Sequence, residues 1–116
     1  MNLKKLFLLI ILMLLSAETY AVAICKNCTV TGIQADPRRG GTYIFVDGDW
    51  SESNTTCNNT LSVKTFWVEA GASVENTTVS LAMLALSTGK TLGYIHGTGI
   101  CTPENYEHVS ILYLKK

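Results

Sequence analysis

Hydrophobic residues form one unbroken run near the start of the chain and shorter, interrupted runs everywhere after it. The unbroken run covers residues 6–15 and follows a short basic start at residues 1–5. A polar break and several small residues come next, a three-part layout that is typical of a secretory signal peptide. We therefore expect a signal peptide over residues 1–23, with cleavage after Ala21 or after Ala23. The run is too short to predict a membrane span.

Five stretches of the remaining chain are rich in β-branched and aromatic residues and predict short strands. The stretches are residues 29–34, 42–46, 61–68, 91–96 and 108–114. Apolar and polar residues alternate at the start of the third stretch, which indicates one buried and one solvated face. Gly32 interrupts the first stretch, and a glycine within a strand is typical of a β-bulge, where the strand bends.

One helix is predicted between the third and fourth strands, because apolar residues there follow the i, i+3, i+4, i+7 spacing of a helical face. This face consists of Val79, Ala82, Met83 and Leu86. Glu75 and Asn76 suit the first turn, and Gly89 followed by Lys90 suits the end. Further apolar residues lie outside the face, namely Leu81, Leu84 and Ala85. The helix should therefore have a second neighbour, for which another subunit is a candidate.

The order of these elements predicts a single, mainly β domain over residues 24–116. Five short strands and one helix suit a small Greek-key barrel of the OB-fold kind, with the helix between strands 3 and 4 closing the barrel. A bulged first strand fits this fold, since that strand must bend to belong to both halves of the barrel. The alternative is an open α+β sheet with the helix on one side.

All four cysteines lie in the predicted mature domain, where export to an oxidising compartment should convert them to disulfides. Four cysteines allow three pairings, and the spacing does not choose among them. A bridge between Cys57 and Cys101 would close a long segment and stabilise the fold by about 4 kcal/mol. Cys25 and Cys28 would then form a possible second pair. A redox site is not expected, because a strand and no helix follows Cys28.

The charge balance argues against a nucleic-acid partner. The chain has nine basic and nine acidic residues, and its formal net charge is zero. A protein that binds many nucleic-acid phosphates should have a clearly positive net charge. We also expect no binding to a membrane surface.

Catalytic and metal-binding patterns are not recognised in the sequence. No Gly-X-Ser-X-Gly motif occurs, and His96 and His108 lie at the ends of predicted strands without a nucleophile beside them. The acidic loop of Asp47, Asp49 and Glu52 is short of a full calcium ligand set. No enzymatic activity, no cofactor and no metal site is therefore expected.

Four short segments of the chain carry a resemblance to a known family. They are residues 29–33, residues 43–46 with Trp50, residues 81–86 followed by Gly89-Lys90, and residues 97–101. With these segments the chain resembles small exported bacterial OB-fold proteins, among them the B subunits of AB5 toxins of the subtilase-cytotoxin and pertussis-like type. The resemblance implies a homo-oligomer, a ring of five subunits lined by the helices, with an A-type toxin subunit as a candidate partner. It also implies recognition of cell-surface glycans.

Candidate ligand-binding residues lie in and beside the first predicted hairpin, at Asp36, Arg38, Arg39 and Tyr43. An arginine suits a carboxylate, and an aromatic ring suits the face of a sugar. The alternative is that these residues form a solvated turn. The leading hypothesis is a secreted or periplasmic bacterial binding module that recognises glycan as an oligomer. The second hypothesis is a periplasmic structural or interaction protein that binds a protein partner and no sugar.

Overall fold

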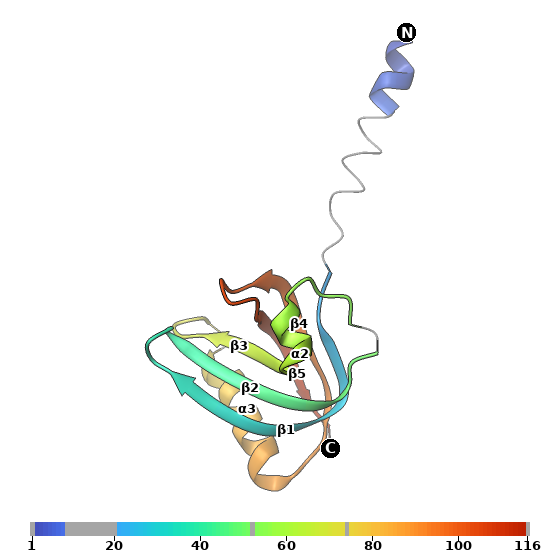
Figure 1. Ribbon diagram of the computed structural model, residues 1–116. Coiled ribbons are helices and arrows are strands. Elements are labelled where there is room, and N and C mark those ends of the chain that lie inside the picture. Colours follow the sequence, from blue (N-terminus) through green and yellow to red (C-terminus); the bar gives the residue numbers. More distant parts are fainter. Residues whose placement is uncertain (1, 9–20, 52, 74, 116) are drawn as a thin grey trace.

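The computed structural model describes residues 2–8, 21–51, 53–73 and 75–115, and the chain is mainly β. Its helices and strands are β1 (Ile24–Asp36), β2 (Gly41–Asp49), α2 (Asn58–Ser62), β3 (Thr65–Glu69), α3 (Glu75–Thr88), β4 (Leu92–Cys101) and β5 (Glu107–Leu114) (Figure 1). Residues 3–8 are also helical. Most of the predicted signal peptide, residues 9–20, lies outside the described residues.

The five strands join in one closed ring in the order β1-β2-β3-β5-β4. In the part of the chain that the structure describes, β3 and β5 run parallel, and the other neighbouring strands run antiparallel. The first strand closes the ring, because residues 24–28 pair with β4 while residues 26–36 pair with β2. This ring excludes the open sheet that the sequence left as an alternative.

The strand β1 bends at two irregularities in its pairing with β2. The register shifts between Lys26 and Thr29 and again between Val30 and Gly32, so the predicted bulge at Gly32 is confirmed. The strand begins at Ile24, five residues before the predicted start at Thr29. The prediction missed these residues because what makes them a strand is pairing with β4, which is distant in the sequence.

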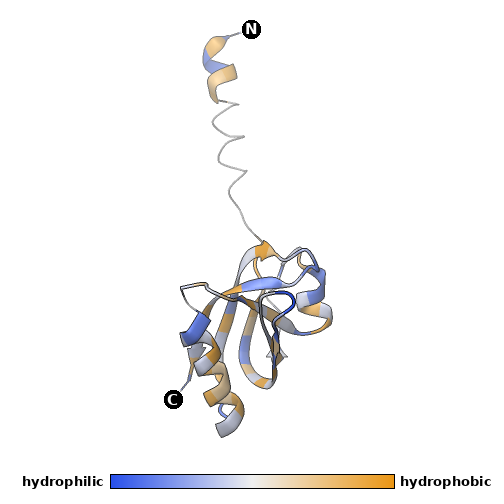
Figure 2. Ribbon diagram, turned by 90° about the vertical axis from the view of Figure 1, so that its left-hand side faces the viewer, coloured by the Kyte–Doolittle hydropathy of each residue, from blue (hydrophilic) through white to orange (hydrophobic). Residues whose placement is uncertain are grey.

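The core lies inside the ring and is built from the inward-facing residues of all five strands. Hydrophobic and hydrophilic residues accordingly alternate along the strands (Figure 2). The largest fully buried apolar side chains are Phe66, Ile44, Leu92, Ile95, Val46 and Val68. Burial of each such side chain stabilises the fold by about 1.5–3 kcal/mol, before the conformational entropy of folding is subtracted.

The helix α3 lies between β3 and β4 in the sequence, as predicted, and packs against the barrel in contact with β1 and β5. Ala82 and Ala85 are fully buried in the core cluster, and Thr78 is also buried. These small side chains let the helix approach the strands closely. The predicted face is partly wrong, because Met83 and Leu86 are exposed.

The predicted third strand is wrong in its first half, since a short helix, α2, occupies Asn58–Ser62 and β3 begins only at Thr65. The turn between them needs a left-handed backbone at Lys64, whose φ is 55°. The helix is held from outside its own sequence, because the Thr60 hydroxyl accepts the Glu107 amide hydrogen at 2.5 Å. Tertiary contacts of this kind override a local alternating pattern.

The fourth strand is longer than predicted, because β4 continues beyond residue 96 through the glycine-rich residues 97–101 and ends at Cys101. Register shifts in the pairing with β5 occur on both sides of Gly97. The glycines therefore produce bulges within a strand and do not end it.

The cysteines pair as expected. Cys57 and Cys101 form one disulfide, with their Cα atoms 5.4 Å apart, and Cys25 and Cys28 form the other, with Cα atoms 6.1 Å apart. The Cys57–Cys101 disulfide joins the start of α2 to the end of β4.

Among the described residues, no helix is both long enough and apolar enough to cross a membrane.

Candidate functional site

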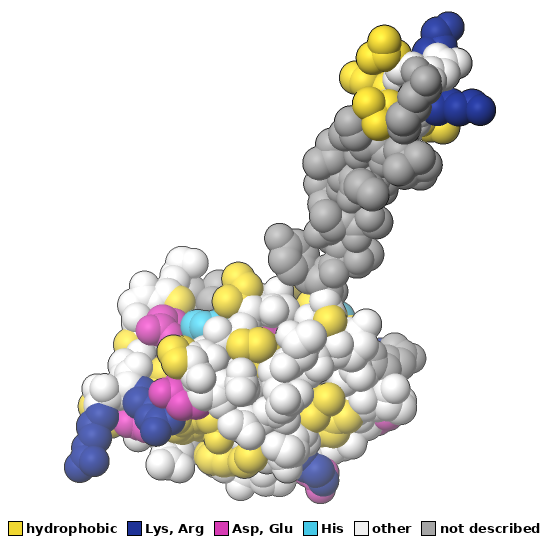
Figure 3. Space-filling model, turned by 45° about the horizontal axis from the view of Figure 1, so that its top comes forward, with side chains coloured by type: hydrophobic (Ala, Val, Ile, Leu, Met, Phe, Trp, Pro, Cys, Tyr) yellow, Lys and Arg dark blue, Asp and Glu magenta, His cyan; other side chains and the backbone are white. Residues whose placement is uncertain are grey.

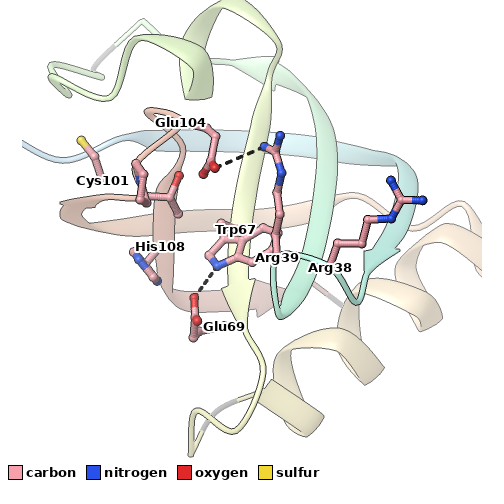
Figure 4. A pocket seen from close by; sticks show the side chains of 9 residues that line it. Arg38, Arg39, Trp67, Glu69, Cys101, Glu104 and His108 are labelled. Atoms are coloured by element: carbon pink, nitrogen blue, oxygen red, sulfur yellow. Dashed lines mark hydrogen bonds and ion pairs between the residues drawn. The ribbon is translucent and has the colours of Figure 1, made fainter.

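A pocket of about 460 Å³ opens at the end of the barrel where the β1–β2 turn faces the β4–β5 loop. Its lining residues come from the β1–β2 turn (Arg38, Arg39), from β3 (Trp67, Glu69), from the end of β4 and the following loop (Cys101, Thr102, Pro103, Glu104) and from β5 (His108) (Figure 4). The parallel pairing of β3 with β5 places Trp67 beside His108. The pocket therefore depends on the closure of the ring.

Trp67 forms a fixed wall of the pocket. Its side chain is 3% exposed, and its indole N–H donates to Glu69 Oε2 at 2.6 Å. The ring lies over Gly41, where an added Cβ would come within 2.3 Å of the indole. Gly41 is thus required for this packing, and the indole N–H is not available to a ligand because Glu69 already accepts its hydrogen bond.

The guanidinium group of Arg39 contacts three other side chains of the domain. Its Nη1 donates to Tyr43 Oη at 3.3 Å and lies 3.5 Å from Glu104 Oε1, and its Nε lies 3.8 Å from Asp36 Oδ2. The hydrogen bond to Tyr43, with the nearby carboxylates, raises the pKa of Arg39 above its ordinary value. Arg39 therefore ties the β1–β2 turn to the β4–β5 loop across the pocket.

Arg38 differs from Arg39 in that its side chain is exposed and makes no hydrogen bond or ion pair within the described residues. Figure 4 shows it extending away from Trp67, while Arg39 reaches Glu104. Acidic and basic side chains lie close together along one edge of the face in Figure 3. An uncommitted guanidinium is the strongest anion-binding group that this pocket offers.

The other two predicted site residues do not line the pocket. The backbone carbonyl of Asp36 accepts the amide hydrogens of Arg39 and Gly40, so Asp36 shapes the turn. Tyr43 is 9% exposed, and its ring packs edge-on against Trp67 and Tyr106 at centroid distances of 4.8 and 5.2 Å. These contacts cover the Tyr43 ring, and its support of a sugar face stays a prediction. Both residues instead hold Arg39 in place.

Sequence reasoning missed most of the pocket, namely Trp67, Glu69, Glu104 and His108. Trp67 lies near the end of the predicted strand at residues 61–68, and Glu69 directly follows that strand. A tryptophan two residues before a carboxylate is the local sequence signal for this part of the pocket. Glu104 and His108 enter only through the β3–β5 pairing, which joins segments about forty residues apart.

The pocket is lined by two carboxylates, one imidazole, two guanidinium groups and the indole of Trp67. Such a set can donate to and accept from several hydroxyl groups at once, and Arg38 can also hold a carboxylate. No cluster of three or more potential metal ligands occurs among the described residues. Comparisons with protein-family models, with curated proteins and with solved structures found no significant match to this chain.

Proposed function

We propose that this protein is an exported, non-enzymatic binding module, built on an OB-fold barrel, that recognises a glycan in the pocket beside Arg38. The OB-fold assignment is supported by the closed strand order, by the parallel β3–β5 pair and by the position of α3 between β3 and β4. Export is supported by two disulfides in a small domain.

The observation that carries this proposal is the difference in side-chain contacts between two adjacent arginines. Arg39 contacts Tyr43, Glu104 and Asp36, whereas Arg38, at the rim of the pocket, has no hydrogen bond or ion pair to any described residue. A sugar brings many hydroxyl groups, which match the carboxylates of the lining, and an acidic sugar also brings a partner for Arg38. The pocket thus favours a polar, negatively charged ligand over an apolar one.

The test is a glycan array probed with the exported protein, followed by binding measurements with the Arg38→Ala variant. Loss of one charge-assisted contact should weaken binding to the best acidic glycan by about tenfold or more. Lys90→Ala is the matched control, because it removes one exposed positive charge that does not line the pocket. Binding to no glycan on the array, or equal binding by both variants, would contradict the proposal.

A second candidate function is binding of a protein partner, with no sugar involved. It is favoured by the apolar side chains that α3 exposes, since Met83 is 57% and Leu84 is 47% exposed. The same surface suits contact between copies of this chain, so the expected homo-oligomer, a ring of five, belongs to the proposal. An A-type toxin subunit stays a prediction from the resemblance alone.

A further inference from the structure

A carboxylate with no access to solvent lies at the end of the barrel, beside Phe66. Glu107, the first residue of β5, is fully buried. Its Oε2 accepts the Ala23 amide hydrogen at 2.8 Å, and its Oε1 accepts the Thr55 hydroxyl. An added Cβ on Gly97 would lie 1.6 Å from Oε2, so the glycine makes the space for this carboxylate. A buried carboxylate needs such donors, because an unsatisfied one is costly.

The two residues before β1 are part of this arrangement. Ala23 is fully buried within the core cluster, and its carbonyl accepts the Gly97 amide hydrogen at 2.8 Å. The Val22 amide donates to Asn54 Oδ1 at 3.1 Å, and the Val22 carbonyl accepts the Asn54 amide hydrogen at 3.3 Å. Val22 and Ala23 therefore make backbone hydrogen bonds to two other segments of the domain.

The two cleavage positions that the sequence allows have different consequences for these contacts. Cleavage after Ala23 would remove the amide donor of Glu107 and the acceptor of the Gly97 amide, and would leave a hole in the core. Cleavage after Ala21 removes none of them. It would instead place the new amino group at the nitrogen of Val22, which already lies 3.1 Å from Asn54 Oδ1 and is partly exposed.

We propose that a signal peptidase hydrolyses the bond between Ala21 and Val22 and that the mature protein begins at Val22. In this step water adds across the amide bond, Ala21 keeps the carboxylate, and Val22 receives the free amino group. Thr19 and Ala21 occupy the third and first positions before this cut, where signal peptidases accept small residues, so the sequence allows this cut as well as the one after Ala23. This inference rests on export of the chain, which is part of the proposed function.

The first test is to express the full chain in a bacterium, isolate the protein outside the cytoplasm and determine its N-terminus by sequencing and intact mass. The expected N-terminus is Val22. A protein that begins at Ile24 would overturn this inference and leave export standing. A chain that is never cleaved would overturn both.

The second test uses a full-length precursor that lacks Val22 and Ala23, so that cleavage after Ala21 yields a protein beginning at Ile24. This protein should melt about 5 °C or more below the unaltered exported protein, because Glu107 and Gly97 lose their partners. Equal melting temperatures would show that the two residues do not contribute to the fold and would overturn the physical basis of the inference.

Discussion

Glu107 joins three parts of the barrel that are far apart in the sequence. Its carboxylate accepts hydrogen bonds from Ala23 and Thr55, and its backbone amide donates to Thr60 in α2. The register of the sheet also pairs it with Phe66 on β3 and with Cys101 on β4. A single side chain thus links the start of β1 to the loop before α2, at the point where β3 and β5 meet.

Replacement of Glu107 by alanine should lower the free energy of unfolding by about 3 kcal/mol, because two donors lose their acceptor inside the barrel. Glu107→Gln is the matched control, since its amide oxygen still accepts the Ala23 hydrogen and its volume is unchanged. The measurement is urea-induced unfolding of the purified protein. Equal stability of the alanine variant and the unaltered protein would refute the role of this carboxylate.

Lys64 illustrates a weaker interaction at the surface. Its ammonium group lies 2.9 Å from Asp47 Oδ1, and this hydrogen bond is the main cause that lowers the pKa of Asp47. A carboxyl group with a lowered pKa stabilises the fold above its ordinary pKa, and this stabilisation is lost as the pH falls through the lowered value. Both side chains are more than half exposed, so the contribution is screened by water and salt.

The Lys64→Ala variant should raise the pKa of Asp47 towards its ordinary value, which a carboxyl NMR titration measures directly. Asp49 serves as the internal control, because its pKa is lowered by Ser51 and should not move in the same variant. A change at Asp49 of the same size as at Asp47 would mean that the effect is not local to the ion pair.

At the scale of elements, α3 shows how a helix can be predicted in place and still be wrong in orientation. Gly89 and the spacing of the apolar residues indicate the position of the helix. The buried residues, however, are Thr78, Ala82 and Ala85, and larger apolar residues point outward. Hydrophobicity alone favoured Met83 and Leu86 for the core. The barrel instead takes small side chains, because they permit close approach of the helix to the strands.

The Leu84→Asp variant tests what the outward face of α3 does. The free energy of unfolding should change by no more than about 0.5 kcal/mol, since Leu84 is 47% exposed. Ala85→Asp is the contrasting variant and should prevent folding, because it buries an unpaired charge. If α3 joins subunits, native mass measurements should show an oligomer that Leu84→Asp dissociates, and an unaltered native mass would remove α3 from the interface.

The positions of the strands were predictable where local residues determine them and not where contacts with distant residues do. β2 begins one residue before its predicted start and ends three residues after its predicted end. Its position was predictable because β-branched and aromatic residues favour a strand locally. The start of β3 depends on Thr60 and on the turn at Lys64, which no local pattern shows. Arg38 and Arg39 were predicted as site residues because an arginine suits a carboxylate. Glu104 and His108, which line the same pocket, come from a distant part of the sequence that no local pattern joins to the arginines.

At the scale of the whole molecule, two disulfides close segments of very different length. Cys57 and Cys101 are 44 residues apart in the sequence, and Cys25 and Cys28 are 3 apart. A longer loop loses more freedom when it is closed, so the two bridges should contribute unequally to the stability of the barrel.

Replacement of Cys57 and Cys101 by alanine should lower the free energy of unfolding by about 4 kcal/mol, and replacement of Cys25 and Cys28 by about 2 kcal/mol. Denaturant unfolding of both double variants provides the comparison. A larger loss for the Cys25–Cys28 variant would show that the short bridge acts through packing in the core, where both its cysteines are fully buried.

The dual pairing of β1 also bears on when this chain acquires its structure. Cys25 pairs with Ile95, so the strand that leads the domain cannot complete its hydrogen bonds until nearly the last strand has been synthesised. Contacts between such distant positions make folding slow compared with that of a helical bundle. Under the export proposed above, the nascent polypeptide is expected to remain unfolded long enough to pass through a translocation pore and to fold only after it has crossed the membrane.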